Sequence, residues 1–511
     1  MMLLAIDVGT TRCKVGLFDH QGRLLSLASR PTPSRRTPDG HAYDPEQLWQ
    51  QLGAAIQDAG REQPLDGVTA VGVSSMAETG LLLAADGTER TPFIPWFDRR
   101  TLSTAEQLHR RVDVERRFYV TGARPSYKCA VSKLLWLQTR EPQITRNATW
   151  LSVADYVVYR LSGALATDYS LATRTYAFDI DRKAWDTAWL REIGLPRHIF
   201  PEALPAGALV GQVTDAVATE LDLPRGAPVV LGGHDHVCAA FAAGAVQPDT
   251  VFDSMGTAET LIGALTRREL RADDYNSGLT FGCHTARHRY YWMGGLSTSG
   301  GSLEWLRRVL GDPPLSYEAL ASLLETIPRQ PSGIVYFPYL TGSGSPHRDE
   351  DVRAAFLGLD EEHGRADLLQ AVLEGTAYEM EWIRRAAARA TERSINHIVA
   401  AGGGARNRRW LQIKADVCGC PLSMLPTPEA TLLGAALLAG LGSGVYNLEA
   451  DALALPALHD NGRVEPDAGR HELYRRLYED GYCRLQEPLR QLAGAVDHRP
   501  RTVPKPPAQD S

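Results

Sequence analysis

The chemistry of this chain is most concentrated around Asp235, in the stretch VVLGGHDHVCAAFAAGAV at 229–246. An apolar run predicts a buried strand before it, and a run of small residues predicts a closely packed helix after it. A carboxylate between His234 and His236 at the end of a strand can accept a proton. The alternative is that Asp235 only caps the N-terminus of the helix, a common role for Asp. This stretch alone leaves both interpretations open.

A second group of polar residues lies in LLAIDVGTTRCKVGLFD at 3–19 and predicts a β-hairpin with a tight polar turn. Gly9 lets the backbone approach a ligand, and the backbone N–H groups and hydroxyls of Thr10 and Thr11 can donate to phosphate oxygens. Asp7 can hold a cation beside them. The pattern D-x-G-T-T is also simply a favourable turn.

The same pattern returns near the midpoint of the chain, in TVFDSMGTAETLI at 250–262. It again has a strand, an acid (Asp253), a turn at Gly256 and Thr257, and a second strand. Repetition of one unit in two halves of suitable size predicts two domains of one fold. Two facing hairpins would grip the phosphate chain of a nucleotide across a cleft. The sequence contains no G-x-x-x-x-G-K-[ST] motif, which argues against a P-loop enzyme.

Length and composition agree with two globular domains. The 511 residues exceed the roughly 250 to 300 that one core usually supports. The net charge of -7 gives no basic field, so we expect no nucleic-acid partner. Neither a signal peptide nor an apolar run of about 20 residues is found, so we expect no membrane partner. Seven cysteines, an odd number, favour a reducing cytoplasm over a disulfide framework.

On these motifs the chain resembles the FGGY family of carbohydrate kinases, from residue 3 to about 490. The resemblance implies an α/β fold of two actin-like (ribonuclease H-like) domains, each with a mixed sheet flanked by helices, and a cleft between them. Residues 1–245 would bind the sugar and carry the first hairpin and the catalytic Asp. Residues 246–490 would carry the second hairpin and the adenosine site. We expect the proline-rich tail 496–511 to be disordered.

For the sugar site, the resemblance points to GVSSMAETG at 72–80, PWFDRRT at 95–101 and the signature-like YKCAVSKLLW at 127–136. The last departs from the family pattern at Cys129 and Ala130, just before Lys133. An aromatic face and carboxylates suit a polyol, because they cover C–H surface and accept hydroxyl protons. The alternative is that the tryptophan belongs to the core and that Asp98 forms a surface ion pair with Arg100. The expected sugar contacts are Glu78, Thr79, Trp96, Asp98, Tyr127, His234 and His236.

For the nucleotide site, the resemblance points to WMGGLSTSGGSLEWL at 292–306 and IVAAGGGARNRRW at 398–410. Glycines there let the backbone lie close to a nucleotide, and Asn407 can hydrogen-bond or cap a helix. The second family signature matches 429–444, where a small-residue helix is expected to pack against a sheet. The expected nucleotide contacts are Gly9, Thr10, Thr11, Gly256, Thr257, Gly300, Gly301, Gly402, Gly403, Gly404 and Asn407.

The resemblance implies an ATP- and Mg2+-dependent kinase that phosphorylates a hydroxyl of a small ketose or polyol. Asp235 would be the general base and, with Asp7, a metal ligand. His234 in G-G-H-D resembles L-fuculokinases and rhamnulokinases, whereas Glu78 with Thr79 echoes glycerol kinases, so the sugar stays open. The segment around Arg174 is expected to be scaffold. A non-catalytic sugar or nucleotide sensor, or a scaffold, is the alternative, and a homodimer stays open.

Overall fold

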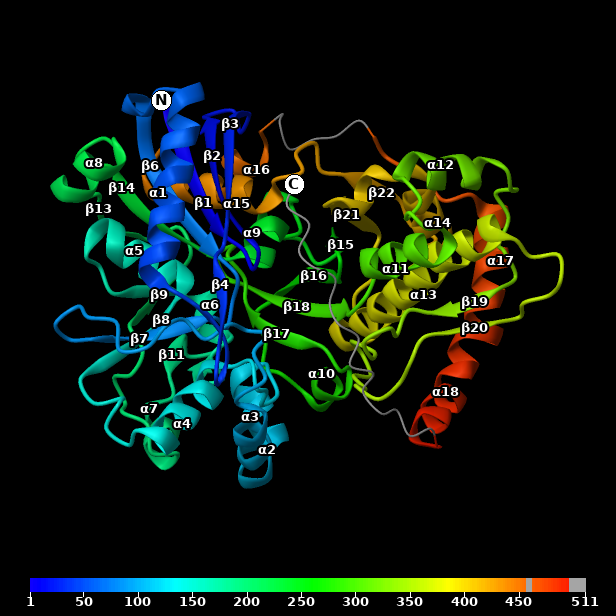
Figure 1. Ribbon diagram of the computed structural model, residues 1–511, viewed down its shortest axis with the longest axis horizontal. Helices are drawn as coiled ribbons and strands as arrows, with labels where there is room; N and C mark the ends of the chain where they lie inside the picture. The colour runs from blue at the N-terminus through cyan, green and yellow to red at the C-terminus, as the bar shows by residue number, and fades with distance from the viewer. Residues whose placement is uncertain (456–461, 496–511) are drawn as a thin grey trace.

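The computed structural model describes residues 1–455 and 462–495, so the tail predicted to be disordered lies outside the described residues. Each half of the molecule is built on a six-stranded mixed sheet (Figure 1). The first sheet has the order β13-β14-β6-β1-β2-β3, with β1 Met2–Val8, β2 Arg12–Asp19, β3 Leu24–Pro31, β6 Val68–Ser75, β13 Leu209–Gln212 and β14 Pro228–His234. The second has the order β17-β18-β16-β15-β21-β22, with β15 Thr250–Met255, β16 Glu259–Thr266, β17 Thr280–Cys283, β18 Arg289–Leu296, β21 His397–Ala401 and β22 Leu422–Met424.

Both predicted hairpins are present, and they occupy corresponding positions in the two sheets. Strand β1 pairs antiparallel with β2 and parallel with β6, which places Asp7 opposite Lys14 and beside Ser74. Strand β15 likewise pairs antiparallel with β16 and parallel with β21, and its Asp253 lies one residue further from the turn than Asp7 does in β1. The two halves therefore repeat one structural unit, as the sequence predicted.

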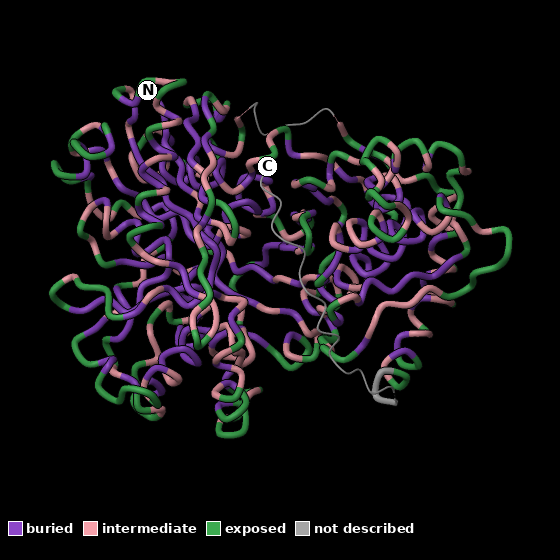
Figure 2. The backbone as a smooth tube through the Cα atoms, in the orientation of Figure 1, coloured by how far each residue is buried: buried purple, intermediate pink, exposed green. Residues whose placement is uncertain are grey.

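The helices cover both faces of these sheets, and this explains why strands such as β1 are apolar almost throughout. Figure 2 shows the sheet of the first half as largely buried chain. In the first half the helices are α1 Pro45–Glu62, α2 Leu102–Arg111, α3 Val114–Thr121, α4 Ala130–Arg140, α5 Val153–Ser162, α6 Tyr169–Thr173, α7 Thr187–Glu192, α8 Asp215–Leu221 and α9 Asp235–Ala242. In the second they are α10 Ala272–Asn276, α11 Gly300–Leu310, α12 Tyr317–Glu325, α13 Arg365–Thr391, α14 Arg408–Cys418, α15 Ala430–Gly442, α16 Glu449–Leu453, α17 Ala468–Arg476 and α18 Cys483–Ala495.

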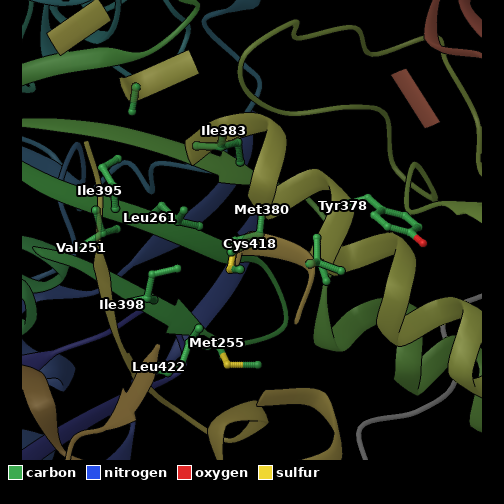
Figure 3. Packing of buried hydrophobic residues seen from close by; sticks show 14 of the residues in the cluster. Val251, Met255, Leu261, Tyr378, Met380, Ile383, Ile395, Ile398, Cys418 and Leu422 are labelled. Carbon is green, nitrogen blue, oxygen red and sulfur yellow. The ribbon is translucent and has the colours of Figure 1, made fainter. Parts of the chain in front are cut away.

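Short two-stranded sheets complete the described fold. Their strands are β4 Ser34–Thr37, β5 Gly40–Tyr43, β7 Gly80–Ala84, β8 Ala148–Ser152, β9 Ala166–Asp168, β10 Phe178–Asp179, β11 Ala184–Trp185, β12 Glu202–Leu204, β19 Val335–Phe337 and β20 Ala355–Leu357. The core of the second half gathers side chains from β15, β16, β21 and the long helix α13 (Figure 3). Among the described helices, none is long and apolar enough to cross a membrane.

Two helices cross between the halves. Helix α9 follows β14 of the first sheet, yet its Val237, Ala239 and Ala240 pack with Phe252 and Ile262 of the second. Helix α15 follows β22 of the second sheet but packs against β1, β6 and β14 of the first, where Figure 1 shows it among the blue strands. The predicted packing of this small-residue helix on a sheet is confirmed, and the sheet belongs to the other half.

The two crossing helices also pack directly on each other. Gly434 of α15 lies so close to α9 that a Cβ atom there would collide with the carbonyl oxygen of Cys238. Close contact of this kind requires small residues, which explains the composition of both helices. The junction of the halves is therefore a tight helix pair directly behind Asp235.

Candidate active site

Asp235 is the first residue of α9, immediately after β14 ends. Its Oδ1 accepts a hydrogen bond of 2.6 Å from the backbone N–H of His236 and lies 3.2 Å from Nε2 of His234. The N-cap position belongs to His234, whose side chain makes no capping hydrogen bond. The capping interpretation of Asp235 is therefore wrong, because its carboxylate binds the next N–H rather than those two or three residues further on.

The surroundings of Asp235 favour a proton acceptor that works near neutral pH. Burial raises the pKa of Asp235 to about 7, against the hydrogen bond from His236. The charge of Glu78 adds to this rise, and that of Arg174 opposes it. A carboxylate whose pKa lies near the working pH is ionised in a large fraction of the molecules and still binds a proton strongly enough to act as a base.

Asp7 lies beside Asp235, at the end of β1. Burial and the charge of Asp235 raise the pKa of Asp7 well above its usual range, while Lys14 and a hydrogen bond from Ser74 oppose the rise. The Ser74 hydroxyl lies 3.4 Å from Asp7 Oδ1. Two adjacent carboxylates that resist joint ionisation fit a divalent cation, and Mg2+ commonly takes one or two carboxylates together with phosphate oxygens and water.

The turn of the first hairpin, where phosphate contacts are expected, is held by neighbouring segments. Gly9 donates its N–H to the carbonyl of Arg12 at 3.0 Å. The carbonyl of Thr10 accepts from the Tyr43 hydroxyl, and that of Thr11 accepts from the backbone N–H of Thr32. These bonds fix the path of the turn through its carbonyl groups.

Trp96 connects this turn to the expected sugar contacts. Its Nε1 donates to Thr10 Oγ1 at 2.8 Å, and its backbone N–H donates to Thr79 Oγ1 at 3.1 Å. Thr79 is fully buried, so its hydroxyl serves to position Trp96. The ammonium of Lys128 lies 4.8 Å from the Trp96 ring centroid. The indole is therefore only partly buried, with a cation at its face, and is not simply a core residue.

Glu78 has a strained backbone, with φ of 66°. The Lys133 ammonium donates to its carbonyl, and Arg174 Nη2 donates to its Oε1 at 2.6 Å. Burial disfavours its ionised form, but the charges of Arg174, Lys128 and Lys133 outweigh this and lower the pKa of Glu78. Left-handed backbone in a residue other than glycine is costly and persists mainly where the surroundings fix it, often at functional sites.

Asp98 and Tyr127 lie close to this group but are engaged by the protein. Both oxygens of Asp98 bind Arg100, and one also accepts from the backbone N–H of His41. The Asp98–Arg100 ion pair of the alternative interpretation exists, but it is buried rather than on the surface. The Tyr127 carbonyl accepts from Thr101 Oγ1 at 2.6 Å, and Arg99 lies 5.6 Å from its ring centroid.

The two histidines that flank Asp235 are close together, with ring centroids 5.6 Å apart. Burial lowers the pKa of His236 to about 4 and that of His234 well below its usual range. Both rings are therefore neutral at pH 7. Within the described residues, Nδ1 of His234 is buried without a hydrogen-bond partner.

The expected nucleotide residues of the second half form one cluster. The backbone N–H of Gly300 donates to the carbonyl of Gly256, and that of Gly301 to Thr257. A Cβ atom on Gly300 would lie 2.6 Å from the Gly256 oxygen, and one on Gly402 (φ 101°) would lie 2.7 Å from that of Met255. Close backbone approach therefore requires glycine here, and the backbone approached is that of the second hairpin.

The glycine run continues into helix α14. Asn407 is the N-cap of this helix, and its side chain accepts from the backbone N–H of Trp410 at 3.1 Å. A Cβ atom on Gly404 would meet the Met255 side chain, whereas one on Gly403 would meet nothing. The run from Gly402 to Gly404 thus lies against the second hairpin and leads directly into α14.

A short segment before α15 links this cluster to Asp7. The backbone N–H of Leu425 donates to the carbonyl of Ala400, two residues before Gly402. Four residues after Leu425, Glu429 accepts from the ammonium of Lys14 at 2.7 Å, and Lys14 is the cross-strand partner of Asp7. The two groups of expected site residues are thus joined through one short connection.

Sequence reasoning missed the role of Arg174. The structure places it on Glu78 and close enough to Asp235 to influence its pKa, although its segment was expected to be scaffold. Lys133 was matched to a family position without the role of holding the strained Glu78. No periodicity connects residues 78 and 174, so only the three-dimensional contact reveals the pair.

A twofold-repeated fold with two adjacent carboxylates at the end of one hairpin and glycine-rich loops around the other is the arrangement of a phosphoryl-transfer enzyme. Models of the FGGY family of carbohydrate kinases match residues 2–242 with the N-terminal domain and residues 252–443 with the C-terminal domain. The chain therefore belongs to the FGGY family of carbohydrate kinases.

Individual proteins agree with this assignment. The chain is 28% identical over 488 residues to the xylulose kinase of Bacillus subtilis (strain 168), covering 93% of this chain and 95% of that protein. It is 31% identical over 496 residues to the glycerol kinase of Thermus brockianus, covering 93% and 96%. The solved xylulose kinase from Rhodospirillum rubrum matches with a TM-score of 0.87 and 26% identity, covering 97% of this chain and 100% of that structure.

These findings confirm the expected fold and enzyme class. The chain is a carbohydrate kinase that phosphorylates a sugar or polyol with ATP. The alternative of a non-catalytic sensor or scaffold finds no support among these relatives.

Proposed function

We propose that Asp235 is the general base that takes the proton from the attacking hydroxyl of a small ketose or polyol. The observation that carries this proposal is the position of its carboxylate. It lies at the start of α9, beside Asp7 and Glu78, with a pKa raised by burial to about 7. General acid–base catalysis needs a group with this pKa within reach of the reacting hydroxyl.

The remaining residues then have distinct tasks. Glu78 and the Trp96 ring would hold the polyol through its hydroxyls and its C–H face, and Arg174 would fix Glu78 in place. The glycine-rich cluster around Gly256 and Gly402 would hold the nucleotide.

Asp7 and Asp235 are the residues that would hold Mg2+. Burial raises the pKa of both carboxyls, the charge of Asp235 adds to the rise at Asp7, and a bound cation would favour their ionised forms. When bound, the metal would supply charge neutralisation for the phosphates of ATP. Sequence similarity to xylulose and glycerol kinases supports a ketose or polyol as the acceptor.

The test is Asp235→Asn, which keeps the size of the side chain and removes the base. We expect kcat to fall by roughly 10² to 10⁴, the usual size of a general-base effect, while ATP still binds. ADP release and equilibrium ATP binding are the two measurements. The matched control is Asp215→Asn, since Asp215 also begins a helix but lies exposed on α8. Unchanged turnover in Asp235→Asn would show that another group takes the proton.

A further inference from the structure

Among the described residues, Lys128 is a cation of the expected sugar site that makes no direct ion pair, although the charge of Glu78 acts on it. Its ammonium lies 4.8 Å from the centroid of Trp96 and 6.0 Å from that of Tyr127, two expected sugar contacts. The side chain is partly buried. Among the residues that the structure describes, it forms no ion pair.

The acids near Lys128 are already engaged by arginines. Glu78 pairs with Arg174 at 2.6 Å. Glu350, on a loop of the second half, pairs with Arg99 at 2.6 Å and with Arg348 at 2.7 Å. Two carboxylates thus face three guanidinium groups, and the ammonium groups of Lys128 and Lys133 add further positive charge beside Glu78.

The electrostatics of Lys128 agree with this count. Burial lowers the pKa of Lys128, and the charges of Arg348 and Arg174 lower it further against the opposing charges of Glu78 and Glu350. An ammonium withdrawn from water without an acceptor is unfavourable. An anionic ligand group would supply the missing partner and restore the charge balance.

We propose that Lys128 and Arg348 recognise a carboxylate at the end of the substrate remote from the phosphorylated hydroxyl. The preferred substrate is then a sugar acid of the aldonate type, a polyol that carries one carboxylate, rather than a neutral ketose or alditol. This inference rests on the proposed function of the same site. It specifies one substrate class within it.

The arrangement of the site supports a carboxylate at this end. Trp96 bridges the two functions, since its Nε1 binds Thr10 of the phosphate turn while its ring lies under Lys128. A substrate that covers this ring can direct one end to Lys128 and the other to Asp235. Lys128 comes from the first half and Arg348 from the second, so the carboxylate would also connect the two halves.

The experiment compares kcat/KM for matched pairs of acid and alcohol in an ADP-release assay. The pairs are D-gluconate with D-glucitol and D-xylonate with xylitol, and D-xylulose and glycerol serve as further neutral acceptors. We expect the best aldonate to exceed its matched alditol, and both neutral acceptors, by about 10²-fold, as for a buried charge pair. A neutral compound as the best acceptor would overturn the inference while leaving the proposed kinase function intact.

Variants of Lys128 and Arg348 test whether these residues cause the preference for the aldonate. Lys128→Met should reduce the ratio of kcat/KM between aldonate and alditol to near one, and Lys128→Arg should restore most of it. Arg348→Gln should reduce the ratio less, because Arg348 is half exposed and already paired. The control is Lys183→Met, since Lys183 also lies over an aromatic ring, 5.4 Å from the centroid of Tyr169, and is no part of the site. An unchanged ratio in Lys128→Met would overturn the inference.

If ADP is released with none of these compounds, the proposed function is contradicted. Binding measurements then test carboxylate recognition separately. A rise in Tm with D-gluconate but not with D-glucitol, lost in Lys128→Met, would still support carboxylate recognition. No rise with either aldonate would contradict it as well.

Discussion

Each hairpin carries an aspartate near the end of its first strand, but Asp253 lies one residue further from its turn than Asp7 does, and the two have opposite surroundings. Asp253 Oδ2 accepts from the ammonium of Lys414 at 2.7 Å, and the same ammonium binds Glu259 Oε1 at 2.6 Å. All three side chains are fully buried. Asp7, by contrast, has only Ser74 as a hydrogen-bond donor within residues 1–455 and 462–495, and it lies beside a second acid, Asp235.

The difference shows how one repeated unit can serve two purposes. In the second half, the buried Lys414 of α14 neutralises Asp253 and Glu259, so Asp253 belongs to the core. Burial and Glu259 raise the pKa of Asp253 to about 7, whereas Lys414 lowers it and stays charged between the two carboxyls. In the first half no such lysine is present among the described residues, so Asp7 remains available to a ligand. Asp253 is thus part of a buried ion network, whereas Asp7 is the acid that we propose to bind a ligand.

Among the variants that test this difference between the hairpins, Lys414→Met should have the largest effect, a loss of stability. The variant leaves Asp253 and Glu259 buried without a cation, and breaking a buried pair in this way costs about 3–5 kcal/mol. Urea unfolding, followed by circular dichroism, measures the free energy of unfolding. A loss below about 1 kcal/mol would mean that the acids become protonated at little cost, and the contrast between the hairpins would disappear.

The second prediction concerns activity. Asp7→Asn should lower turnover about 10- to 100-fold, the size of effect expected when metal ligation is impaired, and should raise the Mg2+ concentration needed for half-maximal rate. Asp253→Asn should keep the turnover of the folded enzyme and lose stability instead, because Lys414 loses one of its partners. Equal loss of turnover in both variants would contradict the division of roles.

The third prediction is the pH dependence of stability without Mg2+. The folded pKa of Asp7 lies above its unfolded value near 3.9, so its stabilising contribution is complete below about pH 4 and is lost as pH rises through the folded pKa. Asn does not titrate. The Tm of Asp7→Asn should therefore increase relative to wild type between pH 4 and pH 8, with each unit of pKa shift worth about 1.4 kcal/mol.

Added Mg2+ should reduce that difference, because it binds the ionised wild-type site and stabilises the fold by mass action. Differential scanning calorimetry at several pH values tests both statements. A Tm difference that stays constant with pH would show that the pKa of Asp7 is not raised in the folded protein without metal.

The smallest expected effect is that of Lys14→Met. Lys14 pairs with Glu429 between the first hairpin and the start of α15, but about a third of its side chain is exposed. Partly exposed pairs contribute about 0.2–1 kcal/mol. Urea unfolding should therefore show a much smaller loss of stability for Lys14→Met than for Lys414→Met. Similar losses in the two variants would contradict the distinction between a partly exposed and a buried lysine.

Local patterns explain which parts of the fold could be predicted. Both hairpins, their turns and the strand-to-helix junction at Asp235 follow from alternation, apolar runs and glycine, which act within a few residues. The sequence could not show that Lys414 reaches Asp253, since a lysine in an amphipathic helix is normally expected at the surface. The two residues are 161 positions apart.

In the candidate site, too, the sequence predicted the residues that belong to motifs but not the partners that control them. Residues recognised by motif, such as Asp7, Asp235 and Glu78, do lie close together. Their controlling partners come from distant positions without a motif. Arg174 reaches Glu78 from the end of a short helix, and the positive φ of Glu78 depends on that contact and on Lys133. Such tertiary contacts fix electrostatics, and no local period encodes them.

The crossing of α9 and α15 has a consequence for cutting or permuting this chain. Residues 1–245 on their own would leave one face of β1, β6 and β14 without the helix that covers it. The second sheet would lose Val237, Ala239 and Ala240 in the same way. Each fragment would therefore expose apolar sheet surface, a risk for aggregation. The halves form a single unit of expression, and co-expressed fragments should be recovered only when they assemble with each other.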